Sequence, residues 1–256
     1  MTKKHTNIVI AVIALFLVSA FVYETALNTN NNREETTAKK STAAPVRRLA
    51  TFDKKQYSIT DPSSIWVVVN KHNALQPKNY TPKLLVFPDV SLRVPGNESM
   101  KMRPETARAL ETMFADAKKD NLDLEVSSAH RSYSFQVSLY GGYVNSQGKA
   151  VADTQSARPG YSEHQTGLVA DIQPTSGKCH LDACFGELAE GKWLKTNAYK
   201  YGFLLRYPAD EQPVTGYTYE PWHFRYIGVA LATEMHHQNI QTLEEFFDLE
   251  DAPDYN

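Results

Sequence analysis

The order of apolar and polar positions along the chain predicts several short strands. Residues 64–70 (SIWVVVN) form a continuous, β-branched apolar run, which is typical of a buried strand. Residues 122–128 (LDLEVSS) alternate as a half-buried strand does. The runs LVADIQ (168–173) and FLLRY (203–207) predict two further short strands.

Helical signals separate these runs. Pro104 suits a first helical position, and apolar residues at helical spacing after it predict a helix that ends near Lys119. A second helix is predicted over 193–201, ended by a glycine, and a third over 243–249, preceded by a capping box. Residues 129–144 predict a loop that enters a helix. Strands and helices mix without a regular βαβ order, so the predicted class is α+β.

The first residues predict export. Two lysines precede an apolar run at 8–23 (IVIAVIALFLVSAFVY), whose only polar residue is Ser19. This length is marginal for a bilayer-spanning helix, which needs about 20 residues, and also suits a signal peptide. We therefore expect residues 1–23 to be a membrane anchor or a cleaved signal peptide, with the rest of the chain outside the cytoplasm. Residues 24–50 are expected to be a flexible linker, and 51–256 the folded domain.

Charge and cysteine content narrow the classes of partner. Residues 51–256 carry 20 Lys and Arg against 26 Asp and Glu, and a net-acidic domain argues against nucleic-acid binding. The only cysteines, Cys179 and Cys184, are separated by four residues. In an exported protein this spacing favours a local disulfide. A metal-binding loop that includes His180 and a free buried pair remain as alternatives.

Candidate chemistry lies in two stretches, SEHQTGLVAD (162–171) and YEPWHFRY (219–226). They supply His164, Asp171 and His223, and two imidazoles with one carboxylate are a common ligand set for a catalytic zinc. Gly167 permits a tight turn that would bring Asp171 back beside His164. On spacing alone, a buried hydrogen-bond acceptor remains the alternative for Asp171.

Glu220 lies three residues before His223, with Pro221 between them. In a regular strand this odd spacing would place the two side chains on opposite faces. Because Pro221 disfavours a regular ladder, a bend there would turn both side chains inward. Glu220 would then lie near the metal without binding it, free to accept a proton.

Four motifs carry a resemblance to a known family. SEHQTGLVAD resembles the Ser-x-His-x-x-Gly-x-x-x-Asp signature of VanY-type D-alanyl-D-alanine carboxypeptidases, and EPWH resembles their Glu-x-Trp-His element. Residues 127–136 (SSAHRSYSFQ) are similar to the arginine-bearing segment of that family, and 191–208 to its helix–strand stretch. The resemblance covers most of 64–229 and leaves the first fifty residues outside.

The resemblance implies a fold and a site. The fold would be a small central antiparallel sheet with flanking helices, the zinc scaffold shared with the hedgehog signalling domain. The resemblance implies Zn²⁺ bound by His164, Asp171 and His223, with Glu220 as catalytic base and Arg131 as the cation that meets the substrate. Other residues are expected to line or shape the substrate cleft, the last two with a core position as the alternative: Ser162, Gln136, Tyr133 and Trp222.

The expected function is that of an exported zinc carboxypeptidase that removes a C-terminal D-alanine from peptidoglycan stem peptides, with D,D or L,D specificity. An endopeptidase with the same zinc site is one alternative. A catalytically silent, zinc-stabilised wall-binding module is another, although such a module would not need Glu220. We expect a monomer that contacts the membrane through its N-terminal segment and faces the cell wall, or is secreted if that segment is cleaved.

Overall fold

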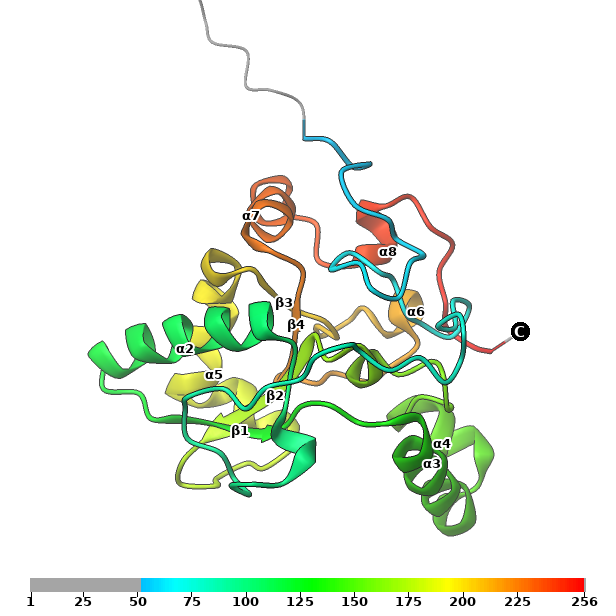
Figure 1. Cartoon of the computed structure of the whole chain (residues 1–256), viewed down its shortest axis with the longest axis horizontal. Coiled ribbons are helices and arrows are strands. Elements are labelled where there is room, and N and C mark those ends of the chain that lie inside the picture. Colours follow the sequence, from blue (N-terminus) through cyan, green and yellow to red (C-terminus); the bar gives the residue numbers. More distant parts are fainter. Residues whose placement is uncertain (1–51, 256) are drawn as a thin grey trace, which may run out of the picture. The chain divides into compact units, whose positions relative to one another are not determined.

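The structure, a computed structural model, describes residues 52–255 (Figure 1). The predicted membrane anchor or signal peptide at 1–23 and the linker at 24–50 lie outside the described residues. Within 52–255, none of the helices combines the length and the apolar character that a bilayer crossing requires.

Four short strands form the central sheet in the order β1-β2-β4-β3. Every neighbouring pair is antiparallel, and the strands are β1 (Leu124–Ser128), β2 (Val169–Pro174), β3 (Phe203–Leu205) and β4 (His223–Tyr226). The predicted α+β class with a small antiparallel sheet is therefore confirmed.

Helices flank the sheet, and Figure 1 places α2 and the α3–α4 pair at opposite ends of the domain. The α-helices are α2 (Pro104–Lys119), α3 (Tyr133–Gln147), α4 (Lys149–Gln155), α5 (Ala189–Asn197), α6 (Gln212–Thr215), α7 (Val229–Gln238) and α8 (Leu243–Phe246). The 3-10 turns are η1 (Glu98–Met100), η2 (Glu163–Thr166), η3 (Ala183–Glu187) and η4 (Ala198–Tyr201).

The two faces of the sheet have different characters because side chains alternate along a strand. On one face, Ile172 of β2 and Phe224 of β4 are fully buried in the main core, together with Leu110 of α2. The same alternation turns Asp171 and His223 toward the opposite face. The polar residues of the candidate site thus lie on the face of the sheet that does not pack against the main core.

The helix predicted from Pro104 to Lys119 is α2, with the bounds that the sequence indicated. Pro104 occupies its first position, where the missing N–H costs no helical hydrogen bond. The side chains at 107, 110, 114 and 117 are buried, as the helical spacing predicted. α2 therefore covers the core face of the sheet for the reason read from the sequence.

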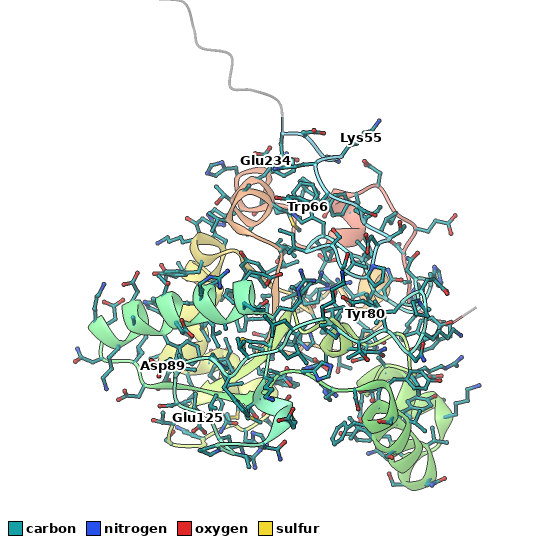
Figure 2. All side chains as sticks on the ribbon, viewed as in Figure 1. Lys55, Trp66, Tyr80, Asp89, Glu125 and Glu234 are labelled. Carbon is teal, nitrogen blue, oxygen red and sulfur yellow. A yellow bond between two sulfur atoms is a disulfide. The ribbon has the colours of Figure 1, made fainter. Side chains whose placement is uncertain are left out.

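The prediction of a strand at 64–70 is wrong, although the prediction that this segment is buried is correct. Trp66 and Val67 are almost fully buried, and Figure 2 shows Trp66 among the side chains between α7 and α8. The backbone there forms no ladder with another strand. Instead, the guanidinium of Arg225 donates to the carbonyls of Ile65 and Val67 at 3.1 and 2.8 Å. A buried arginine satisfies the polar groups that a neighbouring strand would otherwise bind.

Three further elements differ from the prediction only at their ends. The helix predicted at 193–201 begins earlier, at α5, and continues through η4 to Gly202, whose φ of 86° ends it. The strand predicted at 203–207 stops at Leu205, because Arg206 turns into a buried charge cluster. The last helix ends at Phe246, and the Thr242 hydroxyl accepts the N–H of Glu245 as its predicted cap.

Cys179 and Cys184 form a disulfide, the favoured alternative for this pair. Within the same loop, His180 makes hydrogen bonds to Gln173 and Arg93. These partners are not metal-ligating groups of the loop, so the metal-binding alternative finds no support there. The disulfide instead closes a short loop beside the end of β2.

Candidate metal centre and substrate cleft

His164 is placed by the turn that precedes β2. Gly167 ends η2 with φ of 69°, a left-handed conformation that lets the chain reverse into the strand. The imidazole Nδ1 of His164 donates to the carbonyl of Ala129 at 2.5 Å. Its other nitrogen, Nε2, then points at the carboxylate of Asp171, 3.5 Å from Oδ2. The backbone carbonyl therefore orients the nitrogen that faces the site.

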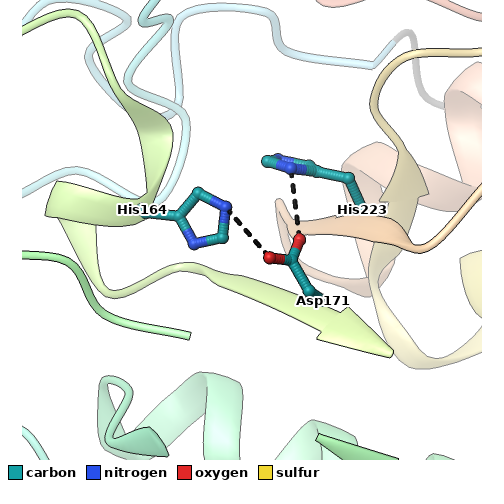
Figure 3. Close-up of side chains that lie close together, drawn as sticks. All are labelled: His164, Asp171 and His223. Carbon is teal, nitrogen blue, oxygen red and sulfur yellow. Dashed lines mark ion pairs between the residues drawn. The ribbon is translucent and has the colours of Figure 1, made fainter. Parts of the chain in front are cut away.

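Asp171 and His223 meet because β2 and β4 pair with these two residues directly opposite each other. His223 Nδ1 lies 3.5 Å from Asp171 Oδ1, and the hydroxyl of Ser128 donates to the other carboxylate oxygen. Figure 3 shows both imidazoles pointing at this carboxylate. One ligand atom from each of His164, Asp171 and His223 lies within 4.8 Å of the others, and all three side chains are buried.

This cluster fits a zinc ion. Among residues 52–255, neither His164 Nε2 nor Asp171 Oδ1 has a hydrogen-bond partner, although both atoms are buried. Buried polar atoms are rarely left without a partner, so a cation is a natural occupant of the space between them. Burial, with Arg131 nearby, holds the pKa of His164 well below its usual value, and a neutral imidazole is the form that binds metal.

Glu220 reaches the same place through a turn. The N–H of His223 donates to the carbonyl of Glu220 at 3.1 Å, so residues 220–223 form a turn with Pro221 at its second position. The predicted bend is therefore present. Glu220 Oε2 lies 3.4 Å from His223 Nδ1, and burial raises the pKa of Glu220 above its ordinary value.

The other side of His223 faces a buried charge network that the sequence did not reveal. His223 Nε2 lies 3.6 Å from Glu163 Oε2, and the other oxygen of Glu163 accepts from Arg206 at 3.0 Å and Arg225 at 2.8 Å. Burial raises the pKa of Glu163, but the two guanidiniums outweigh it and lower that pKa to about 2. Glu163 thus remains ionised next to His223. Burial in turn lowers the pKa of His223, but the carboxylates of Glu163, Glu220 and Asp171 outweigh this and raise it to about 9.

Glu163 stands beside His164 in the motif, which was the one available signal for this network. The two arginines gave none, because most arginines are exposed and only the fold shows that these two are fully buried.

A cleft opens next to the three-residue cluster. His164, His223 and Glu220 form part of its lining, and two further predicted residues, Arg131 and Ser162, line it as well. Gln136 lies behind its wall, where the side-chain amide donates to the carbonyl of Ala157 at 2.7 Å. The sequence did not single out six other residues of the lining: Gln155, Ser156, Ala157, Glu163, Tyr207 and Tyr217.

The remaining predicted residues lie differently. Arg131 is only one-fifth exposed, and its guanidinium lies 3.7 Å from Asp171 Oδ2. Tyr133 begins α3 and is not part of the cleft lining. Trp222 is partly buried and packs against the main core, which agrees with the core position that was the alternative for this residue. Substrate contact by Tyr133 or Trp222 stays a prediction.

Comparisons with known proteins point in one direction. The family described as VanY, D-alanyl-D-alanine carboxypeptidase, matches residues 99–229. The putative carboxypeptidase YodJ of Bacillus subtilis (strain 168) is 44% identical over 192 residues, which are 75% of this chain and 70% of YodJ.

Two solved structures are similar as well. The LD-carboxypeptidase LdcB has a TM-score of 0.70 at 43% identity, covering 74% of this chain and 88% of its own. A mutant of the vancomycin-resistance D,D-pentapeptidase VanY, from a VanB-type cassette and in complex with Zn(II), has a TM-score of 0.57 at 31% identity. That match covers 72% of this chain and 98% of the VanY chain.

Proposed function

This chain belongs to the VanY family of D-alanyl-D-alanine carboxypeptidases, and from that premise we propose that it removes a C-terminal D-alanine from peptidoglycan stem peptides outside the cytoplasm. It is a zinc metallopeptidase. One observation carries the proposal: a buried His164–Asp171–His223 cluster, with unpartnered ligand atoms, lies beside Glu220 at a small cleft.

Each side chain has a role in this proposal. His164, Asp171 and His223 hold the zinc, which when bound polarises the scissile carbonyl and makes a water molecule more acidic. Glu220 takes the proton of the attacking water and passes it to the leaving amine. Its place next to His223, and its absence from the ligand triangle, support this assignment.

Arg131 binds the terminal carboxylate of the substrate. Among the described residues that line the cleft, it is the one Lys or Arg, and a carboxypeptidase needs a cation at this place. A guanidinium can hold a carboxylate through two parallel hydrogen bonds. Tyr207 and Tyr217, both buried, also line the cleft, and their rings leave room for a terminal residue with a small side chain.

The configuration of the second-last residue of the stem, D or L, distinguishes D,D from L,D activity. LdcB is an LD-carboxypeptidase and VanY a D,D-pentapeptidase, and both are similar to this chain. We propose that the identity of 43% with LdcB, against 31% with VanY, favours L,D activity on tetrapeptide stems.

The test is to incubate the purified full chain with muropeptides that end in a pentapeptide or a tetrapeptide stem. Parallel reactions contain added zinc or a chelator, and mass spectrometry measures the products. We expect the loss of one alanine residue, faster from the tetrapeptide and blocked by the chelator. Faster loss from the pentapeptide would overturn the L,D assignment, and cleavage of cross-bridges without alanine release would make the protein an endopeptidase.

Replacing Arg131 with Lys is expected to raise the KM for a stem peptide by about ten- to a hundredfold, because lysine keeps the charge but cannot form the two-bond contact. Steady-state kinetics on the preferred stem measure this, with the exposed Arg108→Lys of α2 as the matched control. A fall in kcat at unchanged KM would instead assign Arg131 to the transition-state oxyanion.

A further inference from the structure

The segment 252–255 lies against the outside of the substrate cleft and joins two of its walls. The hydroxyl of Tyr255 accepts the backbone N–H of Arg158 at 2.8 Å. The same hydroxyl lies 3.1 Å from that of Tyr217, so one of the two donates to the other. Tyr217 lines the cleft, and Arg158 directly follows Ala157, which lines it too. A single hydroxyl therefore links both walls.

Tyr255 is itself held firmly. The guanidinium of Arg158 lies over its ring, 3.9 Å from the centroid, and the ring of Tyr161 meets it edge-on at 5.2 Å. Arg158 is fixed in turn by an ion pair with Asp153 of α4 at 2.8 Å. Burial raises the pKa of Tyr255 to about 12, so its hydroxyl stays protonated at neutral pH. These contacts leave the ring little freedom to move.

The rest of the segment is fastened to the loop that carries Tyr217. The ammonium group of Lys71 donates to the carbonyls of Gly216 and Pro253 at 2.6 and 2.7 Å. The N–H of Ala252 donates to the carbonyl of Val214 at 2.8 Å. At Gly216, with φ of 81°, an added Cβ would lie 2.4 Å from the carbonyl oxygen of Ala252. The backbone of this loop and that of the segment therefore pack directly against each other.

Packed rings connect Tyr255 to the metal cluster. The centroids of Tyr217 and Tyr207 are 4.9 Å apart, and those of Tyr207 and His223 are 4.7 Å apart. Tyr207 and Tyr217 are both buried. Because buried rings are close-packed, a shift of Tyr217 changes the width of the cleft that Tyr217 lines.

We propose that Tyr255 is a positioning residue that sets the width of the cleft around the terminal residue of the substrate, and so selects for a side chain as small as that of alanine. This inference rests on the proposed carboxypeptidase function and adds a determinant of its specificity. Tyr255 does not line the cleft, so it acts through Tyr217 and the 156–158 wall.

The experiment compares Tyr255→Phe with the wild type in the full chain, on stem peptides that end in D-alanine or in the bulkier D-leucine. Phenylalanine keeps the ring contacts and removes only the hydroxyl. We expect the preference for D-alanine, taken as the ratio of kcat/KM values, to fall about tenfold, mainly through a higher kcat/KM for the D-leucine peptide, which a wider cleft admits. Tyr217→Phe breaks the same link, so the double variant is expected to lose no more selectivity than either single one.

Tyr201→Phe is the matched control, because it removes a hydroxyl that is also hydrogen-bonded, to Asp116 at 2.7 Å, but lies away from the cleft. It is expected to keep the wild-type selectivity. Equal losses of kcat/KM on both peptides in Tyr255→Phe would leave Tyr255 with a purely stabilising role and overturn the inference. A wild type that releases no terminal residue would refute the proposed function instead, and the inference with it.

Discussion

Glu220→Gln is expected to keep its zinc and to lower kcat by about 10²- to 10⁴-fold, the usual contribution of a general base. Glutamine has nearly the same shape as glutamate but cannot accept a proton from water at neutral pH. The zinc ligands proposed here are other residues, so the metal is expected to stay. Alanine release from stem peptides measures kcat, and elemental analysis of the same sample measures zinc per chain.

The surroundings of Glu220 make this variant informative. The backbone turn from Glu220 to His223 depends on a main-chain hydrogen bond, which the substitution does not touch. A glutamine amide can also still meet His223, 3.4 Å from the present carboxylate. Lost turnover in Glu220→Gln would therefore reflect the missing base and not a change in the fold.

Glu234→Gln is the matched control for Glu220→Gln. Glu234 lies on α7, labelled in Figure 2, and its carboxylate meets only Gln238 among the described side chains, at 2.6 Å. Wild-type turnover in Glu220→Gln would remove Glu220 as the base. A loss of zinc in that variant would instead make Glu220 a ligand.

Much of the fold follows from local signals in the sequence. α2 begins at Pro104 and buries the face that its spacing predicts, and β2 falls within one residue of the predicted run. Residues 64–70 show where local signals fail. An apolar run predicts burial, but a strand also needs a partner, and here Arg225, some 160 residues away, binds the carbonyls instead.

The site divides in the same way. The spacing of His164, Gly167 and Asp171 is a local property, since one turn brings the first and last together. Asp171 and His223 lie opposite each other only because β2 and β4 pair in one particular register. Residue spacing does not give that register, and it was the family resemblance that implied that the two residues bind one metal. Tyr255 lies 38 residues from Tyr217, and no sequence pattern linked them.

The buried arginines form a second group that only the fold reveals. Arg206 bridges Glu163 behind the metal cluster and Glu244 of α8, at 3.0 and 2.6 Å. The amide of Asn70 donates to the same Glu244 at 2.9 Å. The misassigned segment 64–70 and the last helix are thus both tied to the carboxylate that faces His223. Burying such charges costs free energy unless each is paired, so these elements have to form together.

His164→Ala is expected to lower the zinc content from about one ion per chain to nearly none, and to abolish alanine release. Two protein ligands remain, and a catalytic zinc site normally uses three. The nitrogen that is lost is also the one that the Ala129 carbonyl orients toward the site. Elemental analysis after dialysis against a weak chelator measures the metal.

A second measurement separates metal loss from misfolding. Zinc that binds only the folded state raises the midpoint of thermal unfolding, so added zinc is expected to stabilise the wild type and not His164→Ala. In the absence of metal, the substitution eliminates the hydrogen bond between His164 and the Ala129 carbonyl, but it also eliminates the cost of burying an imidazole. Its metal-free midpoint is therefore expected to stay near that of the metal-free wild type.

His237→Ala, an exposed position on α7, serves as the matched control and is expected to bind zinc as the wild type does. Unchanged zinc content in His164→Ala would refute the ligand assignment and leave the unpartnered nitrogen in the site without an explanation.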